Sequence, residues 1–501
     1  MQLKYRIVGY IALLMLLINM PAWAVKHSAD SEFVCSGKLE TEVWQLWDVS
    51  AKEYLRSKQF IKRLKEQGDT FALYDVQTYT HNLVAMAQRC KRMDRLGEFA
   101  DMFGMAYATL ETTPDGKDGV AWVCKGGAVC NDKNRLINRE VMLISAQFLA
   151  LTASVANGLA LAPKQKRGMF VEQTTMIGLQ HLLRWGDDEA MRELDRQIAT
   201  QVHEVKDGSS PQYFTDKHLW MIAIYADLAG VLRSNPSLLK EAKLTKDQLR
   251  SMRAHLSKLL KLFAARVTVM EGVGRDGQAV MLADLDRGFW RLHADNRYAG
   301  YSGSEKPVNC IKRADGRFQT IVSLDAGTLK PIENIGWDIS HARRLVHAFD
   351  AIQRNRKALQ QVFGVSAAAL PTAQTMRAFA QQLVVNVWNG DIEFPLFSNY
   401  WSGANGWYRV AYDNGTPRCV EGYPPFGLSD SFATGGYASW GRYAPEIRPL
   451  GRRLYRLSVS DGEAVSLFID KYYPGLGDQE SAGNRMLTQL MFWPTLVEAR
   501  Q

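Results

Sequence analysis

The main pattern along the chain is the spacing of apolar residues by three or four positions, which is typical of amphipathic helices. Strand patterns are few, and the clearest cover residues 318–324 and 407–412. The helices that the pattern predicts cover residues 40–66, 74–106 with a break near Lys91, 138–156, 169–185, 189–203, 215–233, 245–267, 333–353, 372–388, 432–443, 462–472 and 480–499. The sequence therefore predicts a mainly α protein.

One predicted helix, which contains the segment GWDISHARR at residues 336–344, carries two stripes of side chains. The first stripe is apolar and consists of Ile335, Ile339, Ala342, Val346 and Phe349. The second stripe consists of Trp337, His341, Arg344 and Ala348. At about 100° per residue the two stripes fall on opposite sides of the helix. This predicts one face in the core and one face on a cavity.

The twelve predicted helices fit packing as helical hairpins, which would form either an α/α toroid or an open α-solenoid. In a toroid, which is an incomplete barrel of helical hairpins, an inner helix packs one face on the outer ring and turns the other to the cleft. That geometry accounts for both stripes, and the long aromatic- and glycine-rich loops of the second half also favour it. We therefore expect one α/α-toroid domain over residues 25–501, with the irregular stretch 271–330 crossing the mouth of the cleft.

The first 24 residues have the pattern of a signal peptide. Lys4 and Arg6 precede an apolar run from Ile7 to Met20, and Ala22-Trp23-Ala24 fits the rule of small residues at a cleavage site. A single membrane-spanning helix is the alternative, but the run is short for a bilayer. No later segment is expected to span a membrane. These features predict a periplasmic or secreted protein.

The cysteine content agrees with export. The six cysteines suggest three disulfides in an oxidising compartment, although fifteen connectivities are possible. Cys124 and Cys130 bracket a short glycine-containing loop that a local bridge would close. The simplest complete set adds Cys35 with Cys90 and Cys310 with Cys419. No Cys or His has the spacing of a metal site, so the sequence predicts neither a metal nor a cofactor.

The net charge of +9 includes two charges from Lys4 and Arg6, and the other basic residues are scattered along the helices, often beside acids. This balance is compatible with an acidic ligand. No basic tail or nucleic-acid motif is present, so binding to nucleic acid is not expected. GVGRDG at 272–277 resembles a nucleotide loop, but no strand is predicted before it and no helix directly after it.

Four segments, at residues 287–303, 336–344, 398–415 and 422–446, combine Trp and Tyr with Arg, Asn, His and Asp. Aromatic faces stack on the C–H faces of sugars, and Arg pairs with carboxylates such as those of uronic acids. The alternative is that these aromatics only pack the core. The candidate substrate-binding residues are Asn296, Trp337, Trp407, Tyr408, Arg409, Asp430, Tyr437, Trp440 and Arg442.

For an acidic glycan, the reaction that needs the fewest special groups is removal of the C5 proton of a uronic acid. β-Elimination follows if an acid protonates the leaving oxygen, and C5-epimerisation follows if the proton returns on the other face. His341 is the best base, with Asp338 to orient its ring and Arg344 to hold a carboxylate. The full set of candidate catalytic residues is His293, Asp338, His341, Arg344 and Tyr400, with His81 as a weaker choice.

Two alternatives to this interpretation stay open. A glycosidase would need two carboxylates facing the cleft, for which Asp338 and Asp430 are the best pair. A non-catalytic glycan-binding or scaffold protein of the cell envelope would need the aromatics alone. In architecture only, and without any matching signature, the chain resembles exported α/α-toroid carbohydrate-active enzymes, namely polysaccharide lyases, uronyl C5-epimerases and glycosidases. That resemblance implies an acidic polysaccharide or oligosaccharide as the partner.

Overall fold

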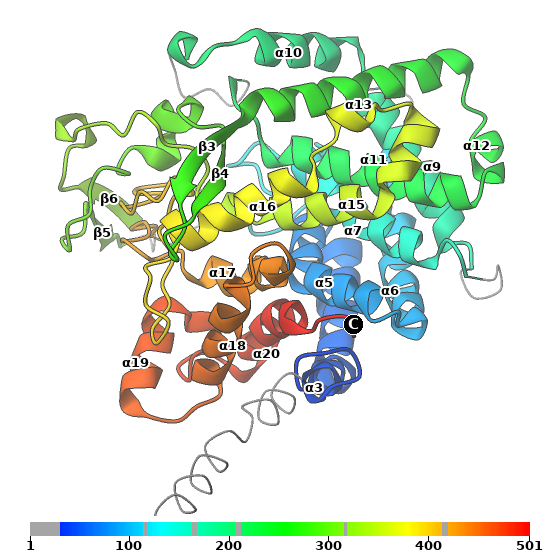
Figure 1. Cartoon of the computed structure of the whole chain (residues 1–501). Helices are drawn as coiled ribbons and strands as arrows, with labels where there is room; N and C mark the ends of the chain where they lie inside the picture. Colours follow the sequence, from blue (N-terminus) through cyan, green and yellow to red (C-terminus); the bar gives the residue numbers. More distant parts are fainter. Residues whose placement is uncertain are drawn as a thin grey trace, which may run out of the picture.

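The computed structural model describes residues 31–113, 116, 119–162, 168–205, 212–314, 318–412 and 419–500. The predicted signal peptide at residues 1–24 lies outside them. The described chain is mainly helical, so the predicted fold class is confirmed at that level (Figure 1). The longer helices are α3 (Lys38–Leu46), η2 (Leu55–Glu66), α5 (Phe71–Arg89), α6 (Met93–Gly104), α7 (Met142–Leu159), α9 (Phe170–Trp185), α10 (Asp188–Ala199), α11 (Asp216–Ser234), α13 (Lys246–Arg266), α15 (Arg344–Phe363), α16 (Ala373–Gln382), α18 (Ile447–Ser458), α19 (Glu463–Tyr472) and α20 (Ala482–Phe492).

Four helices follow one another side by side through the centre of the molecule. In this series α5 packs on α7, α7 on α11, and α11 on α15. Helix α20 also packs on α5. Helices α6, α9 and α13 lie against this series. The two ends of the described chain also meet, because the N–H of Cys35 donates to the carbonyl of Glu498 at 2.8 Å. The chain thus returns to its beginning, with α20 beside both α3 and α5.

Helix α7 is the most apolar of the central helices. It is the one described helix that is long and apolar enough to cross a membrane, which the sequence analysis did not anticipate. However, 78% of its 18 residues are buried inside the protein, where they contact α5, α6, α9 and α11. Its apolar character is therefore that of a central core helix, which is buried on all sides.

Three two-stranded antiparallel sheets accompany the helices within the described part of the chain. The largest pairs β3 (Val267–Val273) with β4 (Ala279–Leu285), and β4 packs on α16. The segment GVGRDG forms the end of β3 and the start of the hairpin turn, so it is not a nucleotide loop. The other two pairs are β1 (Glu111–Thr112) with β2 (Val120–Ala121), and β5 (Val308–Lys312) with β6 (Phe318–Val322). The stretch 271–330 is consequently more regular than expected.

Several predicted elements differ from the structure. The predicted strand at 407–412 is wrong, because Arg409 and Ala411 have φ of 51° and 56°, which no strand allows. The predicted helix 333–353 begins later, as α14 (Ile339–Ala342), and breaks at Arg343 before α15. The predicted helix 432–443 is two short turns, α17 (Asp430–Thr434) and η11 (Tyr437–Arg442).

All three predicted disulfides are present. Cys35 is bonded to Cys90, Cys124 to Cys130, and Cys310 to Cys419. No free cysteine remains among the described residues. Complete pairing of the cysteines indicates that the protein matures in an oxidising compartment.

Candidate functional site

The candidate site is centred on His341 in the short helix α14. The segment before this helix is extended and pairs antiparallel with the aromatic loop at residues 398–415: the N–H of Trp401 donates to the carbonyl of Trp337 at 2.8 Å, and the N–H of Ile339 donates to that of Asn399 at 2.9 Å. This pairing fixes Asp338 opposite Tyr400. The predicted aromatic segments 336–344 and 398–415 therefore do come together.

Asp338 is the N-cap of α14 and orients His341. Its Oδ1 accepts from the backbone N–H groups of Ser340 (2.9 Å) and His341 (3.1 Å), while its Oδ2 lies 2.5 Å from Nδ1 of His341. Burial alone would raise the pKa of Asp338, but the His341 ring and the hydrogen bonds hold it well below its usual range. An ionised carboxylate only accepts, so Nδ1 carries the hydrogen and Nε2 is left as a proton acceptor.

A buried network supports this pair from behind. The Tyr408 hydroxyl donates to Oδ2 of Asp295 at 3.3 Å and lies 3.3 Å from Nδ1 of His341. Asp295 also accepts from Nε of Arg409 at 2.9 Å. The side chain of Tyr408 is fully buried, whereas 15% of the His341 side chain is exposed. Tyr408 and Asp295 therefore position His341, and the histidine faces outward.

Arg344, the first residue of α15, connects α14 to two central helices. It donates to the carbonyl of Ser340 and, at 3.3 Å, to the hydroxyl of Tyr74 on α5, and it lies 3.6 Å from Asp216 at the start of α11. Burial raises the pKa of Tyr74, but the positive charges of Arg344, Arg343 and Arg409 outweigh it and lower the pKa below its ordinary value. The N-terminal ends of α5, α11 and α15 thus meet at one charged cluster.

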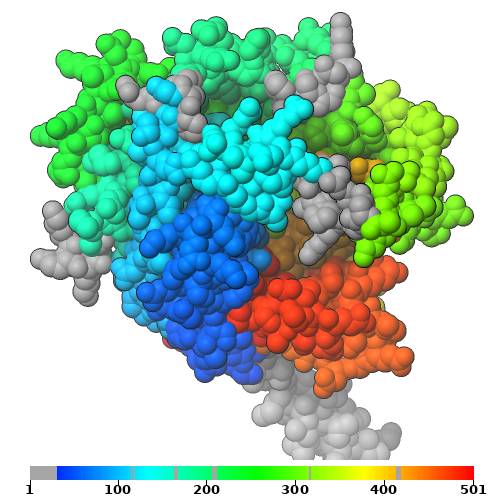
Figure 2. All heavy atoms as spheres, turned by 180° about the vertical axis from the view of Figure 1, so that it is seen from behind, coloured from blue at the N-terminus to red at the C-terminus, as the bar shows by residue number. Residues whose placement is uncertain are grey.

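Arg343 and Asp430 extend the cluster toward α17. The side chain of Arg343 makes no hydrogen bond or ion pair with another described residue. Burial raises the pKa of Asp430 to about 6, and the charge of Arg343 opposes part of that rise. Tyr423, which is 42% exposed, is sensitive to the charges of both Asp430 and Arg409. In Figure 2, the orange part of the chain, to which the residue range 422–446 belongs, lies behind the surrounding cyan, green and red surfaces.

Several predicted binding aromatics are instead core residues. Trp337, Tyr400, Tyr437 and Trp440 have no exposed surface, and Trp407 is 3% exposed. Four of them use their polar atoms internally; for example, the Tyr400 hydroxyl donates to the Trp407 carbonyl at 2.9 Å, and that of Tyr437 donates to the Ile339 carbonyl at 2.6 Å. Nε1 of Trp440 is buried without a hydrogen-bond partner. A buried aromatic ring offers no face to a sugar, so the prediction that these residues stack on a sugar is wrong. Tyr400, which was predicted as a catalytic residue, is likewise buried in the core. Trp337 also precedes the helix whose stripe it was expected to share.

The remaining candidates divide between the cluster and other places. His293 packs on Trp290 with ring centroids 4.5 Å apart, and its charge environment includes His341 and Asp295. Burial lowers the pKa of His293. Asn296 is buried and donates to the carbonyl of Trp290 at 2.7 Å, so it supports the loop. Arg442 pairs with Asp350 in a different pocket, which α15 and Arg89 line.

The sequence analysis missed Tyr74 and Asp216. Both stand at starts of amphipathic helices, where a tyrosine and an aspartate are ordinary residues, and nothing local in the sequence marks them. Only the side-by-side packing of α5, α11 and α15 brings them to Arg344.

Within the described residues, no group of three or more His, Cys, Asp or Glu side chains is arranged to hold a metal ion. The chain matches no known protein family, no curated protein and no solved structure. Function is therefore argued from the geometry of the cluster alone.

Proposed function

We propose that this protein is an exported enzyme of α/α-toroid fold that acts on an acidic, uronic-acid-containing glycan by β-elimination or C5-epimerisation. The toroid is supported by the series α5, α7, α11 and α15, whose N-terminal halves together line one pocket, and by α6, α9 and α13 packed against the series. Export to the periplasm or out of the cell is supported by the three disulfides together with the predicted signal peptide.

The observation that carries the proposal is the combination of two proton-transfer groups with arginines in one cluster. His341 presents Nε2 as a base, because Asp338 holds the hydrogen on Nδ1. Tyr74 is protonated below its pKa, and its lowered pKa makes it a better proton donor than a free tyrosine. Arg344 contacts Tyr74 directly, and Arg409 acts on both Tyr74 and Asp338 by its charge.

These groups suit chemistry at C5 of a uronate. Arg344 and Arg409 hold the carboxylate and stabilise the negative charge that develops as the C5 proton leaves. His341 takes that proton at Nε2, and the electron pair of the C5–H bond becomes the C4–C5 double bond as the bond from C4 to oxygen breaks. Tyr74 then gives its proton to the leaving oxygen. In epimerisation the bond to oxygen stays, and Tyr74 returns a proton to C5 from the opposite face.

A glycosidase on the same scaffold is the second candidate. The raised pKa of Asp430, about 6, is the observation that favours it, since a general acid must hold a proton near neutral pH. Asp338 does not serve as its partner, because it is buried and both of its oxygens are occupied. Of the two carboxylates predicted for hydrolysis, only Asp430 keeps that role.

The test incubates the purified mature protein with a panel of uronic-acid polysaccharides and follows ultraviolet absorbance and reducing ends. Elimination creates a conjugated unsaturated uronate, which absorbs, whereas hydrolysis creates reducing ends without that absorbance. Proton exchange at C5 in heavy water detects epimerisation. Saturable binding without any of these three signals would leave only a glycan-binding protein, and the proposal would be wrong.

A further inference from the structure

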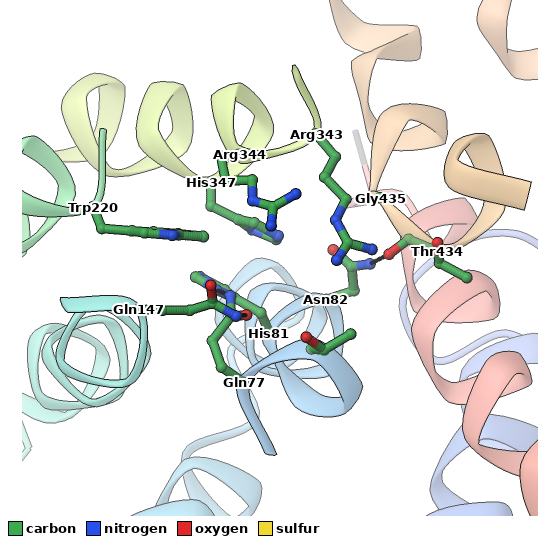
Figure 3. A pocket seen from close by; sticks show the side chains of 11 residues that line it. Gln77, His81, Asn82, Gln147, Trp220, Arg343, Arg344, His347, Thr434 and Gly435 are labelled. Carbon is green, nitrogen blue, oxygen red and sulfur yellow. Dashed lines mark hydrogen bonds between the residues drawn. The ribbon is translucent and has the colours of Figure 1, made fainter. Parts of the chain in front are cut away.

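A polar pocket adjoins the cluster of His341, Tyr74 and Arg344 and shares Arg344 with it. The pocket lies about one helical turn further along α5 and α15. About 290 Å³ of space in the pocket and at its open mouth is not filled by atoms. Its walls come from all four central helices and from the end of α17 (Figure 3). The lining residues are Gln77, Thr78, His81 and Asn82 of α5, Gln147 of α7, Trp220 of α11, Arg343, Arg344 and His347 around the start of α15, and Thr434 and Gly435.

Three buried polar atoms of this lining have no hydrogen-bond partner: Oγ1 of Thr78, Nε1 of Trp220 and Oε1 of Gln147. The side chains of Trp220 and Gln147 are each only 1% exposed. Leaving a buried polar group unpaired costs about 1–3 kcal/mol. Three such atoms around one small pocket indicate that the pocket is shaped for a polar ligand.

The charge of the pocket comes from its arginines. Arg343 extends into it and has no partner among the described residues, while Arg344 is already engaged by Tyr74 and Asp216. Asp and Glu are absent from the pocket lining. An unpaired guanidinium in such a place favours an anion, which it can bind through two parallel N–H groups.

The two histidines of the pocket add further donors. Their rings stack with centroids 3.6 Å apart, and both stack on Trp220. Gln147 donates to Gln77, whose Nε2 in turn lies 2.6 Å from Nδ1 of His81, so the hydrogen of His81 is on Nε2. The ring of His347 has no hydrogen-bond partner among the described residues. Donors therefore outnumber acceptors, and the unpaired Oε1 of Gln147 is a place for one hydroxyl.

We propose that this pocket binds one carboxylate group of a hydroxylated sugar acid, with Arg343 as its cation, Trp220, Thr78 and His347 as further donors, and Gln147 accepting from a neighbouring hydroxyl. Assignment to the glycan rests on the proposed function: Arg344 and Arg409 hold the reacting uronate, and this pocket holds the carboxylate of an adjacent uronate. The enzyme then requires at least two consecutive acidic units.

Calorimetric titration of the full mature chain with glucuronate tests the site, with glucose, the methyl ester of glucuronate, acetate and inorganic phosphate as comparison ligands. We expect glucuronate to bind, and glucose and the ester to bind at least tenfold more weakly. Arg343→Gln removes the charge, and Trp220→Phe removes one N–H but keeps a stacking ring. Each should weaken glucuronate binding roughly ten- to hundredfold, as expected for hydrogen bonds to a charged group.

Arg377→Gln is the matched control, because this exposed arginine on α16 lies outside the pocket, and it should bind glucuronate like the wild type. Equal affinity of wild type, Arg343→Gln and Trp220→Phe would overturn the proposal, as would equal binding of the ester. Acetate or phosphate binding as tightly as glucuronate would overturn the sugar acid as ligand. Glucuronate binding that depends on Arg343, without turnover of any glycan, would sink the proposed function and leave the site standing. Turnover of a glycan with the same KM in wild type, Arg343→Gln and Trp220→Phe would support the proposed function and exclude this pocket as a binding site.

Discussion

Nδ1 of His341 lies 2.5 Å from Oδ2 of Asp338, and the same aspartate caps the helix on which the histidine stands. One buried carboxylate therefore sets the position of the backbone, the orientation of the ring and the tautomer. In the neutral ring this arrangement leaves Nε2 of His341 as the proton acceptor, on a side chain that is 15% exposed. Replacing this carboxylate by an amide separates the structural role of Asp338 from its chemical role.

Asp338→Asn should keep the fold and lose turnover. Asparagine caps helices about as well as aspartate, so the free energy of unfolding should change by less than about 1 kcal/mol. The amide cannot hold Nδ1–H as a carboxylate does, so kcat should fall by roughly 10²–10⁴. The measurements are kcat and denaturant unfolding on the same preparation. Unchanged kcat would mean that Asp338 only caps the helix.

Tyr74→Phe should lower kcat by a similar factor, because it removes the proton donor beside Arg344 while keeping the ring. Binding of the glycan should change little. Tyr79→Phe is the matched control, since Tyr79 lies on the same helix and burial, next to Asp75, raises its pKa to about 12. Equal activity of the two variants would exclude Tyr74 from the chemistry.

Acid should destabilise the protein through its buried histidines. Burial lowers the pKa of His81 and His218 to about 3 and that of His181 and His255 to about 4, each from 6.5. Below pH 6.5 the unfolded chain takes up protons that the folded chain does not, so stability falls as the pH falls.

The loss should reach about 1.4 kcal/mol per pH unit for each histidine between pH 6.5 and about 4. Unfolding curves recorded across this range measure the slope. His218→Gln should reduce the slope even if it lowers the overall stability. A stability that stays constant down to pH 4 would contradict the burial of these rings.

Gly336→Ala should destabilise the segment that carries Asp338. A Cβ at this position would lie 2.4 Å from the carbonyl oxygen of Leu285 and 2.9 Å from Oδ1 of Asp284, so the pairing of β4 with this segment must shift. A cost of about 1–3 kcal/mol is expected. Gly483→Ala in α20 is the control, because a Cβ there meets nothing within 4 Å, and it should be neutral or stabilising. Equal thermal midpoints for the two variants would contradict the close packing at Gly336.

Periodicity predicted the helices well, because most of them bury a regular apolar stripe. It also predicted the break near Lys91, where Cys90 and Arg92 separate α5 from α6. It failed where tertiary contacts override the local pattern. The start of the predicted helix at 333 is drawn into pairing with Asn399 and Trp401. Arg409 takes a left-handed conformation at 51° while its guanidinium reaches Asp295.

The sequence predicted the part of the candidate site whose residues lie close together in the chain. His341, Asp338 and Arg344 are near neighbours in one segment, so their spacing showed that they could act together. Tyr74, Asp216 and the pocket around Arg343 come from helices far apart in the sequence, and only packing assembles them. The prediction that the aromatic residues of the loops bind a sugar was wrong for Trp337 and Trp440, which are buried in the core.

The most direct test of the central claim is proton exchange at C5 of uronate units, followed by nuclear magnetic resonance in heavy water, with wild type, His341→Ala and Tyr74→Phe on the same polysaccharides. The account predicts deuterium at C5, or its loss to an unsaturated product, with the wild type. It predicts neither with His341→Ala, which should still bind the glycan. Exchange that survives in His341→Ala, or a wild type that binds uronate polymers and leaves every C5 proton in place, would contradict it.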